Sequence, residues 1–220
     1  MKEEVEVKIK RGLESFQTDT YKKRERVYHT LETKQNPDIL YIGCSDSRVS
    51  PEVILNAEPG EIFVLRNIAN KVPSLSKNEV DPTTMSAIEF AVLVLKVSSI
   101  VVCGHSNCGG CAAALSGEKG LSELPFTKHY LKSLEELSEK VTREASDKSA
   151  KEKAKVMEER NVLEQVEHLK EYAFINERLA DGRLELEGWR FDIGSGQVER
   201  YDEKAEQFVP ILLNQKLHTD

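Results

Sequence analysis

At 220 residues, the chain is long enough to bury one substantial hydrophobic core. Its formal net charge of -7, from 31 Lys and Arg against 38 Asp and Glu, argues against a nucleic-acid-binding surface. No apolar run approaches the roughly 20 residues that span a bilayer, and the N-terminal residues lack the apolar core of a secretory signal. We therefore expect a cytoplasmic protein without a membrane segment. The absence of an internal repeat or a flexible linker favours a single domain over residues 1–220.

Residues 1–36 form the first predicted element, a charged helical arm. Its apolar residues recur at spacings of three and four, which is typical of an amphipathic helix: Val5, Ile9, Leu13 and Phe16. The alternation of Val5, Val7 and Ile9 also fits a strand. A helix of this kind must pack against its own sheet or against a second subunit, and Pro37 marks its end.

Three apolar runs of strand length follow, separated by helical patterns. The strands are predicted at Asp38–Gly43, Glu61–Asn67 and Ile100–Cys103. The helices are predicted at 50–55, with Ser50 as the cap, and at Thr83–Val97, with Thr83 as the cap. Strand, helix and strand over residues 61–105 form a right-handed crossover unit, which makes a parallel sheet the expected arrangement. We therefore predict an α/β fold with a central, mostly parallel β-sheet flanked by helices.

The second half of the chain is predicted to be mostly helical before a final hairpin. Helical patterns occupy residues 109–117, 131–141 and 163–174, and the charged stretch 142–155 indicates a solvated helix or connection. Strands at Leu184–Asp192 and Gln197–Tyr201 form a hairpin that adds antiparallel strands to an edge of the sheet, and a short amphipathic helix ends the chain. The histidines on the charged helices and in the tail are expected to be solvated: His29, His129, His168 and His218.

Metal-ligating side chains follow two of the predicted strands directly. Cys44 comes after the first strand, and His105 and Cys108 come after the third. The carboxyl ends of parallel strands meet at one edge of the sheet, so these side chains converge if the two strands are neighbours. Two thiolates and one imidazole suit tetrahedral Zn²⁺ and leave a fourth position for water or a carboxylate. The sequence therefore predicts a zinc site at this edge.

Asp46 and Arg48 flank one serine beside this site and point the same way along an extended stretch. A guanidinium binds a carboxylate through two parallel hydrogen bonds, which lowers the pKa of the carboxyl group and holds it off the metal. We expect this paired state, with water in the fourth metal position. The alternative is a site that Asp46 closes as a fourth ligand, so that the metal only stabilises a binding module without catalysis.

Two other uses of the cysteines remain open from the residues alone. Cys103, Cys108 and Cys111 have the spacing of plant ferredoxins, with Cys44 as a fourth iron ligand, but this arrangement places Cys103 inside a strand and gives His105 no role. A thioredoxin-like pair of Cys108 and Cys111 needs its first cysteine free of metal. The simpler interpretation is that Cys103 and Cys111 pack as small buried hydrophobes.

The motifs together resemble the signature of the β-class carbonic anhydrases. The resemblance covers nearly the whole chain: Cys44-Ser-Asp46-Ser-Arg48, Pro59-Gly-Glu, Arg66-Asn-Ile-Ala-Asn70, Ser86-Ala-Ile-Glu-Phe90, His105-Ser-Asn-Cys108-Gly-Gly and Gly188-Trp189. It implies one Zn²⁺ per chain on Cys44, His105 and Cys108, with Asp46 and Arg48 as the catalytic dyad. It also implies an obligate dimer, often paired into tetramers, whose N-terminal helix lies across the partner.

The resemblance also implies a reaction and a substrate pocket. The family hydrates carbon dioxide reversibly to bicarbonate and a proton by the attack of a zinc-bound hydroxide. Gln35 matches the glutamine that donates to a substrate oxygen, and Gly109 is expected to bind substrate as well. Phe63, Ile68 and Phe90 match the apolar wall of the pocket, part of which the neighbouring subunit supplies. Some relatives carry Tyr where Phe90 stands, so a hydroxyl contact is missing from this chain.

Overall fold

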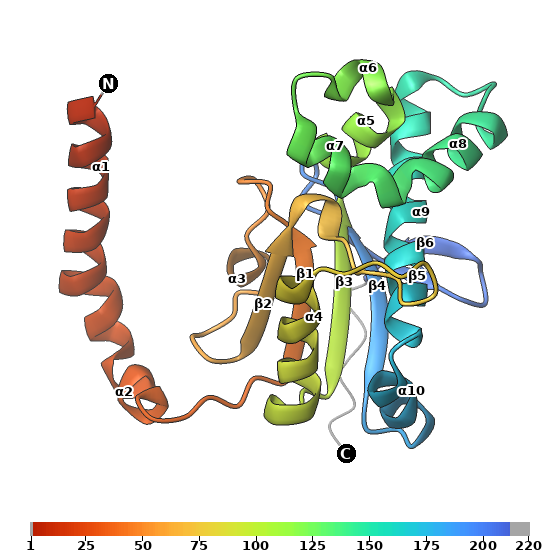
Figure 1. Ribbon diagram of the computed structural model, residues 1–220. Coiled ribbons are helices and arrows are strands. Elements are labelled where there is room, and N and C mark those ends of the chain that lie inside the picture. The colour runs from red at the N-terminus through yellow and green to blue at the C-terminus, as the bar shows by residue number, and fades with distance from the viewer. Residues whose placement is uncertain (1, 212–220) are drawn as a thin grey trace.

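A six-stranded β-sheet forms the centre of the computed structural model, which describes residues 2–211 and all side chains in that range except those at 118 and 119 (Figure 1). The strand order is β2-β1-β3-β4-β5-β6. The strands are β1 (Ile39–Cys44), β2 (Ile62–Asn67), β3 (Ser99–His105), β4 (Glu185–Phe191), β5 (Val198–Asp202) and β6 (Gln207–Pro210). Neighbours from β2 to β4 are parallel, and those from β4 to β6 are antiparallel. The predicted α/β fold with a mostly parallel sheet is confirmed.

The predicted hairpin is confirmed, since β4 and β5 pair antiparallel, but the C-terminal strands differ from the prediction in two respects. β4 pairs parallel with β3, with Gly188 opposite Val102, so only β5 and β6 are antiparallel edge strands. The chain between β3 and β4 returns through the long helix α9 (Ala150–Lys170), and a crossover of this kind gives a parallel pair. β6 is a further strand that the sequence pattern does not predict. The predicted C-terminal helix falls on residues 212–220, outside the described residues.

Helices lie around the sheet, and several of them cluster above the carboxyl ends of its parallel strands (Figure 1). They are α3 (Pro51–Ile54), the 3-10 turn η2 (Ile68–Asn70), α4 (Pro82–Glu89) with its π-helical continuation η3 (Phe90–Leu95), α5 (Gly109–Ser116), α6 (Glu118–Leu121), α7 (Pro125–Leu131), the 3-10 turn η4 (Lys132–Leu134), α8 (Glu135–Glu144) and α10 (Ala173–Ala180).

Asp81, and not the predicted Thr83, caps α4. Its carboxylate accepts hydrogen bonds from the backbone N–H groups of Thr83 and Thr84, which leaves Thr83 inside the first turn.

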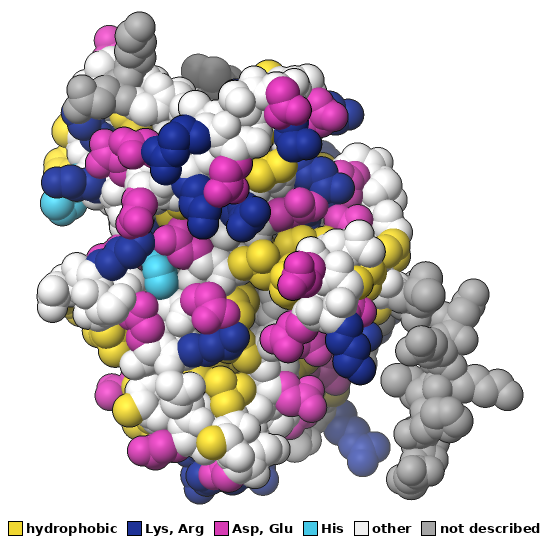
Figure 2. Space-filling view, turned by 90° about the vertical axis from the view of Figure 1, so that its right-hand side faces the viewer, with side chains coloured by type: hydrophobic (Ala, Val, Ile, Leu, Met, Phe, Trp, Pro, Cys, Tyr) yellow, Lys and Arg dark blue, Asp and Glu magenta, His cyan; other side chains and the backbone are white. Residues whose placement is uncertain are grey.

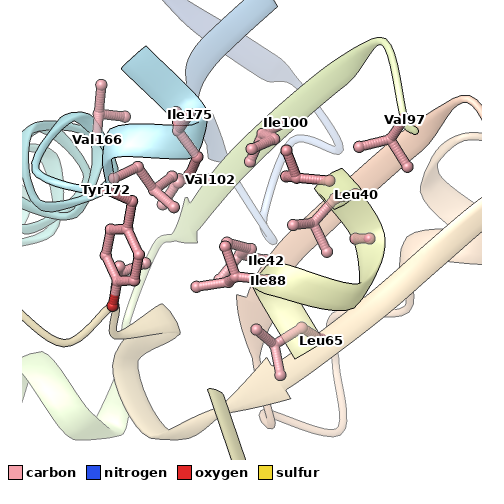
Figure 3. Close-up of a cluster of buried hydrophobic side chains, with 14 of the residues drawn as sticks. Leu40, Ile42, Leu65, Ile88, Val97, Ile100, Val102, Val166, Tyr172 and Ile175 are labelled. Carbon is pink, nitrogen blue, oxygen red and sulfur yellow. The ribbon is translucent and has the colours of Figure 1, made fainter. Parts of the chain in front are cut away.

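The main hydrophobic core lies between the sheet and the helices α4, α9 and α10 (Figure 3). Side chains alternate along a strand, so Leu40 and Ile42 of β1 enter this core, while Tyr41 points to the opposite face. Ile88 of α4 and Ile100 of β3 meet them there, and all four aliphatic side chains are fully buried. Each such burial contributes about 1.5–3 kcal/mol, which fixes β1 and β3 as neighbours.

Polar residues on the inner face of α9 hold the irregular segment that follows β2. Asn161 donates to the carbonyl of Ala69 (2.9 Å), Gln165 accepts from the N–H of Val72 (2.7 Å), and His168 Nδ1 lies 2.8 Å from the Val72 carbonyl oxygen. The prediction that His168 is solvated is therefore wrong, because the segment 69–72 offers it a buried partner. These contacts fix η2, which borders the site described below.

The other histidines agree with the sequence prediction where the structure describes them. His29 and His129 are exposed on α2 (Tyr21–Leu31) and α7, and His218 lies outside the described residues. The charged stretch 142–155, which joins α8 to α9, is mostly exposed as well. Figure 2 shows a face of the molecule on which basic and acidic side chains are interspersed, which is typical of a solvated surface.

The N-terminal arm extends away from the sheet (Figure 1). It consists of α1 (Lys2–Ser15), the π-helical η1 (Phe16–Thr20) and α2. The helical pattern is thus correct, and the strand alternative is wrong. Val5, Ile9 and Leu13 on α1 are 56 %, 57 % and 57 % exposed, so the apolar face of the arm does not pack on the sheet of its own chain. An ion pair between Arg24 and Glu58, with 2.5 Å between Nε and Oε2, links α2 to the rest of the chain.

Candidate metal centre

Two loops bring a Cys-His-Cys group together above the sheet. β1 and β3 are parallel neighbours, with Gly43 opposite Cys103, so their carboxyl ends meet at one edge. Cys44 ends β1, His105 ends β3, and Cys108 directly precedes α5. The ligand atoms of these three side chains lie within 4.8 Å of one another, and the residues are 4 %, 1 % and 2 % exposed. The group is therefore compact and shielded from solvent.

The imidazole of His105 is oriented by its own loop. Nδ1 lies 3.0 Å from the carbonyl oxygen of Ser106, which can only accept, so Nδ1 carries the proton and Nε2 presents its lone pair. Within the described residues, the buried Nε2 has no hydrogen-bond partner. An orphaned buried acceptor beside two thiols fits a divalent metal ion of the zinc type, because zinc takes nitrogen and sulfur ligands. The donor set is thus able to bind a metal.

The surroundings of both thiols disfavour their ionisation. A hydrogen bond with Cys108, together with burial, raises the pKa of Cys44 to about 12. A hydrogen bond with Cys111, together with burial, raises the pKa of Cys108 to about 12. Burial lowers the pKa of His105, but the neighbouring Cys44 and the carbonyl oxygen of Ser106 outweigh this effect and raise it. A metal must displace the thiol protons, so its binding releases protons and strengthens as the pH rises.

Asp46 and Arg48 form the expected ion pair beside this group. The Arg48 backbone N–H and Nε donate to Asp46 Oδ1, each over 2.9 Å, and Nη2 donates to Oδ2 over 2.7 Å. The hydrogen bonds from Arg48 hold the pKa of the Asp46 carboxyl well below its usual range. Nη2 of Arg48 also donates to the Asn107 carbonyl oxygen (3.0 Å), which ties this ion pair to the loop between His105 and Cys108.

Arg66 is a structural support of the site whose role the sequence motif does not reveal. Its Nε donates to the carbonyl oxygen of Cys44 (2.9 Å), and its Nη2 donates to that of Asp46 (2.7 Å). The N–H of Ser45 donates to the carbonyl oxygen of Asn67 (2.8 Å). The end of β2 therefore fixes the backbone that carries both the thiol and the carboxylate. The only sequence signal is that Arg66 belongs to the Arg-Asn motif after a strand.

The remaining two cysteines lie outside the Cys-His-Cys group. Cys103 points to the opposite face of the sheet, where it packs with Tyr41 and Val101, and burial raises its pKa to about 12. The ferredoxin-like set is therefore not assembled. Cys111 is 3 % exposed and lies in the same buried cluster as Cys44 and Cys108. All four cysteines are free thiols.

The predicted apolar wall is partly assembled in the single chain. The rings of Phe63 and Phe90 have centroids 6.1 Å apart, and Phe90 and Ile68 are 43 % and 42 % exposed. A Cβ on Gly110 would lie 3.0 Å from Ile68 Cγ2, so this glycine allows α5 to approach η2 closely. A Cβ on Gly109 would meet nothing within 4 Å, which leaves open space directly after Cys108.

Gln35 is not brought to the metal centre of its own chain. It is exposed in the connection between α2 and β1, next to the amino end of β1. Cys44 lies at the other end of this strand, and six extended residues span about 20 Å. Any contact of Gln35 with substrate would therefore have to occur in the site of a second subunit.

Comparison with known proteins assigns the chain to a family. The family model described as carbonic anhydrase matches residues 39–198, which run from the first residue of β1 to the first residue of β5. The chain belongs to the β-carbonic anhydrase family. Carbonic anhydrase 1 of Escherichia coli O157:H7 is 38 % identical over 208 residues, which cover 94 % of this chain and 92 % of the relative. A carbonic anhydrase of Pseudomonas aeruginosa is 38 % identical over 91 % of this chain and 89 % of its own length.

Solved structures of the β class have the same fold. The structure of the β-carbonic anhydrase CcaA superposes with a TM-score of 0.89 at 32 % identity, over 93 % of this chain and 98 % of that one. A tetrameric β-carbonic anhydrase of Sordaria macrospora gives a TM-score of 0.75 at 32 % identity, over 90 % and 96 % of the two chains. The chain is thus an enzyme, a carbonic anhydrase. Within residues 2–211, no helix is both long enough and apolar enough to cross a membrane.

Proposed function

We propose that this carbonic anhydrase hydrates carbon dioxide reversibly to bicarbonate and a proton, with one Zn²⁺ per chain on Cys44, His105 and Cys108. The observation that carries the proposal is the buried Cys-His-Cys group, whose ligand atoms lie within 4.8 Å of one another. Three protein ligands are typical of catalytic zinc, because they leave a fourth position open. Bound zinc would supply Lewis acidity that makes water a nucleophile near neutral pH, although two thiolates weaken this effect.

Asp46 would orient the nucleophile. Its pKa is lowered by Arg48, so the carboxylate stays ionised and can only accept hydrogen bonds. Arg48 engages both oxygens, which fixes the carboxylate and opposes its movement onto the metal. The remaining lone pair on Oδ2 of Asp46 can accept a hydrogen bond from the nucleophile and direct its oxygen toward the substrate.

The apolar wall of Phe63, Ile68 and Phe90 would bind carbon dioxide and exclude water. The exposed fractions of Ile68 and Phe90 leave them accessible to a small apolar ligand or to a second subunit. Gly109 would leave room for the substrate, because a side chain there would project into the open space beside Cys108. Phe90 has no hydroxyl group, so it contributes shape and not a hydrogen bond.

We also infer that the chain folds as one domain and functions as a dimer or tetramer. The exposed apolar face of the arm, residues 1–36, needs a partner, and Gln35 can reach substrate only in a neighbouring chain. The relative from Sordaria macrospora is tetrameric. Four free cysteines favour a reducing compartment, and we propose the cytoplasm.

A metal analysis combined with stopped-flow hydration of carbon dioxide tests the proposed function. One zinc per chain and hydration activity that increases from about pH 7 to about pH 9 are expected. The bidentate pair of Asp46 and Arg48 makes a site closed by Asp46 less favourable. Zinc at one per chain without hydration at either pH would instead support that purely structural site. A purified protein without zinc would contradict the proposal.

A further inference from the structure

A buried carboxylate lies directly behind the loop from His105 to Cys108, which we call the metal loop. Glu158, on the inner face of α9, is 3 % exposed, and its Oε1 accepts a hydrogen bond from the backbone N–H of Cys108 over 3.4 Å. This is a long contact, but its acceptor is a carboxylate, which strengthens hydrogen bonds. Cys108 precedes the first turn of α5, so its N–H has no partner within the helix. Glu158 thus supplies the acceptor for the backbone of a proposed metal ligand.

Arg190 of β4 holds this carboxylate in place. It is 5 % exposed, and its Nη2 lies 3.1 Å from Glu158 Oε2. Its Nη1 lies 3.2 Å from Glu199 Oε2 on β5, directly across the antiparallel pair, and 3.9 Å from Asp192 Oδ2. The register of β4 also sets Arg190 opposite Gly104, next to His105 on β3. Two neighbouring strands therefore fix the guanidinium that fixes Glu158.

Two glycines allow α9 to come close enough for this contact. A Cβ on Gly104 would lie 2.6 Å from Val162 Cγ2, and a Cβ on Gly188 would lie 3.0 Å from Val162 Cγ1. A side chain at either glycine would push α9 away from the sheet. Glu158 lies one helical turn before Val162, so the close approach also places its carboxylate against the metal loop.

A buried ion pair is a poor means of gaining stability. Desolvation of two charges offsets most of their attraction, and apolar residues of the same volume often stabilise a fold equally well. Stability alone therefore does not account for Glu158 and Arg190. The contact of Glu158 with Cys108 indicates instead that the ion pair orients a metal ligand. Loss of a group that orients a metal ligand typically lowers metal affinity by about 10–100-fold.

We propose that Glu158, fixed by Arg190, is a positioning residue that orients Cys108 for the metal. The inference rests on the proposed zinc site and extends it to α9 and β4. The hydrogen bond fixes the peptide plane that precedes the Cys108 side chain, so the thiol remains directed at Cys44 and His105 when the metal is absent. Loss of the acceptor would let this peptide rotate and would weaken metal binding.

Two double variants separate the acceptor from the buried charges. In Glu158→Gln with Arg190→Met, an amide oxygen still accepts from Cys108, and neither substituted side chain carries a charge. In Glu158→Met with Arg190→Met, the volume is similar but the acceptor is gone. Both double variants lose the contact of Arg190 with Glu199, so this loss is common to them and does not affect their comparison. Glu164→Gln is the matched control, since it changes another ion-paired glutamate of α9, 3.1 Å from Lys77 Nζ, away from the metal loop. Zinc affinity is measured by competition with a chelator, and Co²⁺-substituted protein reports the thiolate ligands through its charge-transfer bands.

The Glu164→Gln control should retain the zinc affinity and cobalt spectrum of the unmodified enzyme. The Gln-containing double variant keeps the acceptor but loses the guanidinium that fixes it, so its zinc affinity should lie between those of the unmodified enzyme and the Met-containing double variant. The Met-containing double variant should bind zinc about 10–100-fold more weakly and show altered thiolate-to-cobalt bands. Equal affinities and equal spectra in the two double variants would overturn the inference, even if their thermal stabilities both change. An unmodified enzyme that binds no zinc would contradict the proposed function instead.

Hydrogen exchange in the unmodified enzyme gives an independent test that needs no folded variant. The Cys108 amide should exchange slowly in the metal-free protein, because the Glu158 carboxylate holds its hydrogen. Exchange at the rate of an exposed loop amide would overturn the inference.

Discussion

Asp46→Asn tests the proposed catalytic role of the carboxylate most sharply. Asp46 accepts three hydrogen bonds from Arg48, over 2.9, 2.9 and 2.7 Å. An asparagine keeps one oxygen and replaces the other with an NH₂ group, which is a donor. In one orientation of the amide, this NH₂ group faces a donor of Arg48, and in the other it faces the nucleophile. We expect kcat/KM for hydration to fall about 10²–10⁴-fold, as for the loss of a general acid–base group. This loss corresponds to about 3–5 kcal/mol of transition-state stabilisation.

The zinc content should stay at one per chain, because Asp46 is not part of the Cys-His-Cys group. Asp181→Asn is a matched control, since Arg183 binds Asp181 through the same three groups, over 3.2, 2.8 and 2.5 Å, on an exposed turn before β4. Stopped-flow hydration with a pH indicator measures both variants, and the control should match the unmodified enzyme. Unchanged hydration by the zinc-loaded Asp46→Asn variant would refute the assigned role.

Three further predictions follow from the site and the arm. Cys44→Ser should lose zinc and hydration together, whereas Cys111→Ser should retain both, as metal analysis with stopped-flow assays would show; zinc loss in the second variant would place Cys111 in the site. The pKa of Asp46 is lowered by Arg48, so this carboxylate stays ionised throughout the neutral range. Hydration should therefore increase toward alkaline pH, because the nucleophile loses its proton there. A loss of activity with rising pH would contradict this prediction. Deletion of residues 2–31 should shift the sedimentation coefficient to a smaller species; an unchanged assembly would show that the arm is not at the interface.

The Cys-His-Cys group was predictable because its signals are local. Strand-forming runs place Cys44 and His105 at strand ends, and the crossover rule makes those strands parallel. Their adjacency is then enough to bring two sequence-distant loops together. The apolar pattern of residues 1–36 predicts a helix for a similar reason, because its period is visible within a few turns.

The supports of the site could not be predicted, because they depend on long-range pairing. Glu158 and Arg190 are ordinary charged residues in their own segments, and their burial follows only from the parallel alignment of β4 with β3. His168 lies among charged neighbours, yet the backbone at Val72 gives it a buried partner. Asp81 and Thr83 are both good helix caps, and only the backbone geometry at Asp81 selects the first.

Zinc K-edge X-ray absorption of the purified enzyme tests the central claim most directly. The Cys44, His105 and Cys108 group predicts one zinc per chain with two sulfur ligands at about 2.3 Å and one imidazole nitrogen at about 2.0–2.1 Å. A bound zinc without sulfur ligands, or with three or four of them, would contradict the account.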